Sequence, residues 1–143
     1  MYRDPRLRGL SSDHHQALVL AVMLKKAAKS GNEATLKAAA QELAERFERE
    51  LDPHFIVEEE VLLPALRARG ASEYDLIERT EVDHAWLREG AAKAAAGETE
   101  HLGVYGERLS DHVRFEEKEL FERCQNILPD AVLDEVWHRC PKE

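Results

Sequence analysis

A histidine and a glutamate recur four residues apart at two distant places in the chain, each time within an otherwise apolar run. The first pair is His54 and Glu58 and the second is His112 and Glu116, and a second glutamate follows directly in both copies. Residues four apart share a face of an α-helix, so each pair places an imidazole and a carboxylate on one apolar stripe. Such groups are costly to bury without a partner, and a bound cation is the expected one.

A second, weaker repeat lies between these copies. The pair Asp13-His14 precedes one apolar dipeptide and Asp83-His84 precedes another. The four elements alternate along the chain, Asp-His, HxxxEE, Asp-His, HxxxEE, which predicts two helix pairs built on one plan.

Composition favours an all-α fold. Ala, Leu, Glu, Lys and Arg dominate the sequence, and β-branched residues are sparse. The periodicity predicts helices over about 12–30, 33–67, 73–96 and 98–125, and a short one over 130–138. Pro53 should kink or split the second helix, Pro64 should end or bend it, and Gly103 and Gly106 should weaken the start of the fourth. Short connections predict an antiparallel, up-down-up-down four-helix bundle with a short extra C-terminal helix, forming a single domain over residues 1–143.

Six side chains on the inward faces of these helices are the candidate metal ligands. They comprise four imidazoles and two carboxylates: His14, His54, Glu58, His84, His112 and Glu116. This mixture lacks a thiolate, so it suits iron or manganese in a two-metal site better than structural zinc. Each carboxylate has two oxygens, which would bridge metals roughly 3.5–4 Å apart, with hydroxide, oxo or peroxide balancing the remaining charge. On the first helix the inward stripe favours His14, and His15, about 100° around, stays the alternative.

Charge and hydropathy exclude several partners. A formal charge of −9 without a cluster of Lys and Arg argues against nucleic-acid binding. No signal peptide or run of ~20 apolar residues is present, so we expect a cytoplasmic protein with no membrane partner. Cys124 and Cys140 form no CxxC pair and read as two ordinary thiols, although a disulfide between them stays open.

The pattern H…HFxxEExxLLPxL…H…HxxxEExxLF resembles the hemerythrin-like, HHE cation-binding domain family over nearly the whole chain. The resemblance implies an antiparallel four-helix bundle around a non-haem centre, usually of two iron ions bridged by carboxylate and oxo or hydroxo groups. Manganese and zinc stay as alternatives. By position the first-helix ligand would be His14, the two HxxxE pairs would supply one imidazole and one carboxylate each, and His84 would be the third-helix ligand.

Two departures separate this chain from the oxygen-carrying hemerythrins. Those proteins have HxxxH on the third helix, where this chain has Arg88, and HxxxxD on the fourth, where it has Glu116 one place earlier and Glu117 at the Asp position. One imidazole is therefore missing. Glu81, on the face of the third-helix histidine, is the first candidate to replace it, and His15 is the second.

These departures count against reversible oxygen transport. The leading interpretation is a di-iron protein that binds, senses or reacts with O2, peroxide or NO. The alternatives are a catalase- or peroxidase-like enzyme, and a metal-storage or interaction bundle without catalysis whose protein partner stays unidentified. The acidic and basic residues next to the candidate ligands, Glu59, Glu60, Glu117 and Lys118, are expected to form solvated faces.

Overall fold

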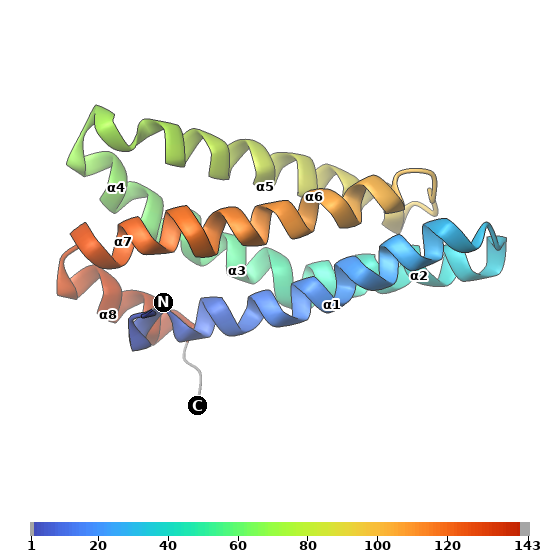
Figure 1. Cartoon of the computed structure of the whole chain (residues 1–143), viewed down its shortest axis with the longest axis horizontal. Coiled ribbons are helices and arrows are strands. Elements are labelled where there is room, and N and C mark those ends of the chain that lie inside the picture. Colours follow the sequence, from blue (N-terminus) through green and yellow to red (C-terminus); the bar gives the residue numbers. More distant parts are fainter. Residues whose placement is uncertain (1, 141–143) are drawn as a thin grey trace.

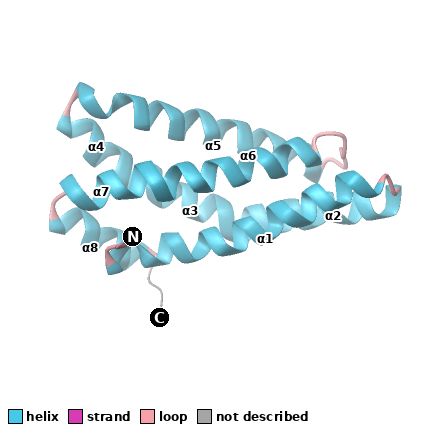
Figure 2. Ribbon diagram, in the orientation of Figure 1, coloured by secondary structure: helices cyan, strands magenta, loops and turns pink. Residues whose placement is uncertain are grey.

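A computed structural model describes residues 2–140 of the protein, and every regular element within them is helical (Figure 2). Four long helical runs lie antiparallel, and a fifth, shorter helix lies at one end of them (Figure 1). The predicted all-α, up-down-up-down bundle with an extra C-terminal helix is confirmed. Within residues 2–140, no helix is both long enough and apolar enough to cross a membrane.

The first long run is α1 (Arg8–Ser30), preceded by the short 3-10 turn η1 (Pro5–Leu7). The second run is continuous through five segments, α2 (Glu33–Arg46), η2 (Phe47–Leu51), α3 (Asp52–Val57), η3 (Glu58–Leu62) and α4 (Leu63–Arg69), of which η2 and η3 are π-helical. The third run is η4 (Ala71–Glu73) and α5 (Tyr74–Ala95). The fourth is α6 (Leu102–Phe115), the π-helical η5 (Glu116–Leu120) and α7 (Phe121–Ile127), and the fifth helix is α8 (Asp130–Arg139).

The first helix begins earlier than the predicted residue 12. Asp4 caps the turn that precedes it, because the Arg6 amide donates a hydrogen bond of 2.9 Å to the Asp4 carboxylate. Pro5 suits this position, where its missing amide hydrogen costs nothing. Helical structure thus starts at this cap, and the expected cap residues near position 12 lie inside α1. The helix ends as predicted, at Gly31 with φ of 62°.

The second run stays helical through both prolines, so the predicted split at Pro53 and end at Pro64 do not occur, whereas the alternative of a kink or bend at each stays a prediction. Each follows a π-helical segment that closes with a backbone hydrogen bond between residues five apart. The Asp52 amide donates to the Phe47 carbonyl oxygen before Pro53, and the Leu63 amide donates to the Glu58 carbonyl oxygen before Pro64. In each case the next residue is the proline, which has no amide hydrogen to place. A wide π turn therefore accommodates a residue that an uninterrupted α-helix would not.

The fourth run begins at Leu102, four residues later than predicted. Gly106 lies inside it and allows α6 to approach α1 closely. A Cβ at this position would lie 2.8 Å from the Ala21 carbonyl oxygen and 3.4 Å from Leu24 Cβ. The glycine that reduces helix propensity is thus required for packing.

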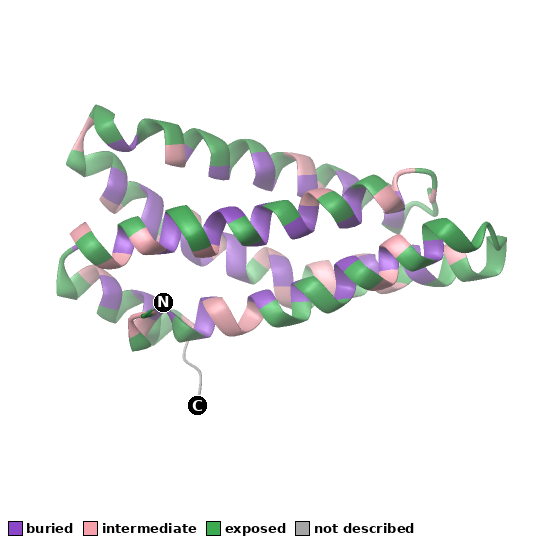
Figure 3. Ribbon diagram, viewed as in Figure 1, coloured by how far each residue is buried: buried purple, intermediate pink, exposed green. Residues whose placement is uncertain are grey.

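The core consists of two apolar clusters along the bundle axis. Figure 3 shows the buried positions along the long helical runs in purple. One includes Leu24, Leu43 and Tyr105, and the other includes Leu10 and Phe121. The candidate site lies at the junction of the two clusters. On the first and third runs the histidine lies between them, and on the second and fourth runs the histidine lies among residues of one cluster and the glutamate among residues of the other. The site therefore forms a polar layer inside an apolar bundle.

Candidate metal centre

The structure brings together all six inward residues predicted from the sequence. Each of the four long runs supplies one histidine, from α1, α3, α5 and α6, and the two glutamates begin η3 and η5. All six are at most 4% exposed, and they are His14, His54, Glu58, His84, His112 and Glu116. Two π-helical segments thus begin at the two central carboxylates, and such segments occur frequently at functional sites.

The six side chains form two overlapping groups. In the first group, His14 Nε2 lies 2.7 Å from Glu116 Oε1, and His54 Nε2 lies 3.0 Å from Glu58 Oε2. In the second, His84 Nε2 lies 3.0 Å from Glu58 Oε1. Within each group of four residues, one ligand atom per residue lies within 4.8 Å of all the others, which is close enough to hold a metal ion.

The two groups share both glutamates. Glu58 directs Oε2 towards His54 in the first group and Oε1 towards His84 in the second. Glu116 directs Oε1 towards His14 and Oε2 towards His112, at 2.7 and 3.1 Å. Each carboxylate therefore divides its two oxygens between the groups, so each would be able to contribute a ligand atom to an ion held in either group.

In each of the four clustered histidines, Nδ1 points away from the cluster and faces a further carboxylate. The Nδ1 to oxygen distances are 2.6 Å for His14 with Glu117, 3.1 Å for His54 with Asp13, 2.6 Å for His84 with Glu59 and 2.9 Å for His112 with Asp83. A carboxylate on Nδ1 fixes the ring orientation and the tautomer, leaving Nε2 free for an ion. We call these four residues the outer carboxylates.

The outer carboxylates connect the helical runs in a closed cycle. Asp13 of the first run contacts the histidine of the second, and Glu59 of the second contacts that of the third. Asp83 of the third run contacts the histidine of the fourth, and Glu117 of the fourth returns to the first. Each run therefore orients the imidazole of the next.

The outer carboxylates were not predicted. Glu59 and Glu117 were expected in solvated faces, and the structure corrects this, because both are only partly exposed and bond to buried imidazoles. The repeated motifs contain a sequence signal for these carboxylates. Both Asp-His pairs and both Glu-Glu pairs place a carboxylate directly beside a candidate ligand, and this adjacent carboxylate contacts a histidine of another helical run.

Two less favoured candidates lie outside the cluster. Glu81 is about half exposed and pairs with Arg67 at 3.2 Å on the surface. His15 is exposed, whereas His14 beside it faces the cluster. Arg88 occupies the position of the second third-helix histidine of the oxygen carriers. Its guanidinium binds the Glu59 carboxylate and does not enter the cluster.

Burial disfavours a charged imidazole, but the facing carboxylates outweigh this effect and raise the pKa of all four histidines. The pKa of His84 rises to about 11 and that of His112 to about 9, and the pKa values of His14 and His54 are raised as well. Burial alone would raise the pKa of Glu116, but the imidazoles hold it well below its usual range. The site therefore favours positive charge between its carboxylates.

The unpaired atoms of the second group fit a metal ion. Within residues 2–140, Glu58 Oε1, His84 Nε2, His112 Nε2 and Glu116 Oε2 are buried and lack a hydrogen bond of acceptable geometry. His84 Nε2 lies 3.0 Å from Glu58 Oε1 and 3.8 Å from Glu116 Oε2, and His112 Nε2 lies 3.1 Å from Glu116 Oε2. A buried polar atom without a partner costs roughly 1–3 kcal/mol. A cation between these two nitrogens and two oxygens would satisfy all four.

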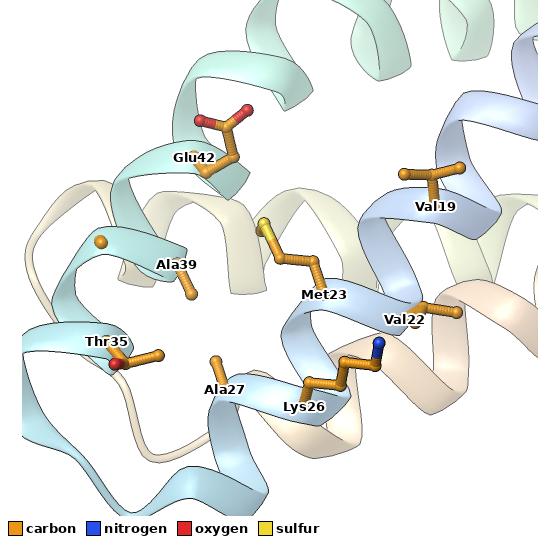
Figure 4. A pocket seen from close by; sticks show the side chains of 9 residues that line it. Val19, Val22, Met23, Lys26, Ala27, Thr35, Ala39 and Glu42 are labelled. Atoms are coloured by element: carbon orange, nitrogen blue, oxygen red, sulfur yellow. The ribbon is translucent and has the colours of Figure 1, made fainter.

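A small void adjoins the first group, with a volume of about 10 Å³. Its apolar wall includes Ala17, Leu51, Leu109 and Val113. A separate groove of about 690 Å³ lies on the surface between α1 and α2 (Figure 4). None of the six clustered residues lines that groove, so it is not connected with their chemistry.

The fold and the site define a helical bundle with buried histidine and glutamate clusters able to hold metal. The family described as hemerythrin HHE cation-binding domain matches residues 7–124, and the chain belongs to this family. The resemblance inferred from the repeated motifs is thereby confirmed. Comparison with curated proteins and with solved structures gives no match.

Proposed function

We propose that the chain holds two iron ions, one in each group of four residues, and that it binds, senses or reacts with O2, peroxide or NO there. The observation that carries the proposal is the division of the Glu58 and Glu116 oxygens between the groups. Imidazole and carboxylate donors without thiolate suit iron or manganese. When bound, two such ions supply Lewis-acid and redox chemistry to small oxygen or nitrogen ligands.

The void beside the first group supports a small ligand. Its volume of about 10 Å³ is close to that of one water-sized probe, which limits a ligand to a few heavy atoms. On the second group, the Phe55 ring stacks on His84 with ring centres 3.9 Å apart and covers that side. The two positions therefore differ, and the first is the expected side of ligand entry.

Peroxide breakdown is the second candidate function. The observation that favours it is Arg88 in the place of the missing imidazole, because the second ion would then have one nitrogen ligand fewer than in an oxygen carrier. Metal storage without ligand chemistry is the third.

The test is anaerobic iron loading followed by elemental analysis and optical spectroscopy. We expect about two iron ions per chain, and loss of at least one in Glu58→Gln and Glu116→Gln, because each removes a shared charged ligand. Glu81→Gln and His15→Gln are the matched controls, since both residues are exposed and lie outside the cluster, and they should bind like the wild type.

Fewer than one iron ion per chain in the wild type would contradict the proposal. With iron bound, a stable and reversible band on adding O2 or NO would indicate binding. Bleaching with gas evolution on adding peroxide would indicate turnover. No spectral response to O2, NO or peroxide would contradict the proposed reactivity and would leave metal storage as the remaining candidate function.

A further inference from the structure

Arg88 lies on α5, one helical turn after His84, and its guanidinium contacts three groups around that histidine. It donates two hydrogen bonds to Glu59, from Nη1 at 2.7 Å and from Nη2 at 3.0 Å. Its Nε donates to Asp52 Oδ1 at 2.9 Å. Its guanidinium carbon also lies over the Phe55 ring, 5.7 Å from the centre.

Two of these groups fix the His84 ring. Glu59 accepts a hydrogen bond of 2.6 Å from Nδ1, which sets the tautomer. Phe55 stacks on the face of the His84 ring, with 13° between the two ring planes and ring centres 3.9 Å apart, and so restrains the orientation of that plane. Together they direct Nε2 towards Glu58 Oε1, 3.0 Å away. Arg88 therefore touches both restraints on this imidazole without touching the candidate ion site.

We propose that Arg88 is a positioning residue for the second group, and that through Glu59 and Phe55 it sets the affinity of the ion bound by His84. The inference rests on the proposed function, since it requires an ion in that group. A planar guanidinium binds a carboxylate through two parallel hydrogen bonds, whereas a lysine ammonium acts as a single point of charge. A lysine should therefore hold Glu59 less firmly than Arg88 does.

The effect should be confined to one of the two ions. The first group takes its outer carboxylates from Asp13 and Glu117, and Glu117 is held by Ser11 at 2.8 Å and by Arg3 at 3.3 Å. Within residues 2–140, no hydrogen bond or ion pair links Arg88 to these groups. Loss of Arg88 should thus weaken the second ion and leave the first unchanged.

The experiment is a titration of the metal-free protein with cobalt(II) against a competing chelator. We expect two binding steps in the wild type, and in Arg88→Gln about a tenfold loss of affinity in one step only, because outer partners of metal ligands typically contribute roughly 10- to 100-fold. Arg88→Lys should not restore that step, and Glu59→Gln should weaken it at least as much. Arg67→Gln is the matched control, because Arg67 also pairs with a glutamate of the bundle, Glu81, but on the surface.

Two further measurements separate positioning from general stability. Urea unfolding of each metal-free variant measures the free energy of unfolding. The nitrogen NMR chemical shifts of the imidazoles in the zinc-loaded protein report the His84 tautomer. We expect altered His84 nitrogen shifts in Arg88→Gln and wild-type shifts in Arg67→Gln.

Wild-type affinity for both ions in Arg88→Gln would overturn the inference, and so would equal weakening of both. A wild type that binds no cobalt would overturn the proposed function itself and this inference with it. These outcomes are distinguishable, because only the last is visible before any substitution is made.

Discussion

The two glutamates of each Glu-Glu pair serve different roles. Glu58 and Glu116 are fully buried and face the histidines of both groups. Glu59 and Glu117 follow them in the chain, remain partly exposed, and accept hydrogen bonds from imidazoles of a neighbouring run. Neutralising the second glutamate of a pair therefore changes the orientation of an imidazole, whereas neutralising the first removes a candidate ligand.

Ala17 provides a test of the void beside the first group, which it lines while being only 3% exposed. Ala17→Val adds two methyl groups to a void of about 10 Å³ and should fill it, at a cost of roughly 1–3 kcal/mol in the free energy of unfolding. We expect wild-type iron content with loss of the optical response to NO. Ala27→Val is the control, on the same helix and 4% exposed but lining the distant groove. An unchanged NO response in Ala17→Val would place ligand entry elsewhere.

Among the elements, the sequence predicts the inward faces better than the helix boundaries. Four-residue spacing puts His54 with Glu58 and His112 with Glu116 on common faces whatever the exact helix type, so the six-residue cluster follows from local geometry. The outer carboxylates could not be predicted in the same way, because each contact joins two different runs and depends on how those runs pack. The π-helical segments were also missed, and they explain why Pro53 and Pro64 leave the second run continuous.

The contact between α1 and α6 gives a prediction at the level of these elements. Gly106→Ala should gain about 1 kcal/mol of helix propensity but place a Cβ 2.8 Å from the Ala21 carbonyl oxygen. Overpacking of this kind costs roughly 1–3 kcal/mol, and a backbone atom cannot move aside like a side chain, so we expect a net loss of about 1–2 kcal/mol in urea unfolding. Gly103→Ala, which meets only the Ala28 methyl group at 3.0 Å, should lose less. A more stable Gly106→Ala variant would contradict this packing.

Over the whole molecule, the polar layer links four helical runs that are otherwise held by two apolar clusters. The cycle of outer carboxylates makes each imidazole depend on the preceding run, so the site forms only when all four runs are in place. The layer also needs compensating positive charge. Six carboxylates surround four imidazoles there, and either protons on the imidazoles or bound cations can supply that charge.

Because protons and ions compete for the same nitrogens, ion binding should release protons. The raised pKa values, about 11 for His84 and about 9 for His112, keep these imidazoles protonated at pH 7 in the metal-free protein, and those of His14 and His54 are raised too. His84 and His112 would each give up one proton to a bound ion, so we expect release of at least two protons per chain on full loading. Calorimetric titration with cobalt(II) in two buffers of different ionisation enthalpy measures this number.

The same linkage fixes the direction of the pH dependence. A folded-state pKa above the ordinary 6.5 means that the imidazoles stabilise the metal-free fold below pH 6.5, and that this stability is lost as the pH rises through about 9 for His112 and about 11 for His84. Ion affinity should change in the opposite direction and rise with pH over this range, because fewer protons must be displaced. His112→Gln should lower the release by at least one proton, because it removes one protonated imidazole and weakens the second ion, whereas His15→Gln, which alters an exposed imidazole, should leave the release unchanged. Release of no protons by the wild type, with two ions bound, would show that the imidazoles are neutral before loading and would contradict the exchange.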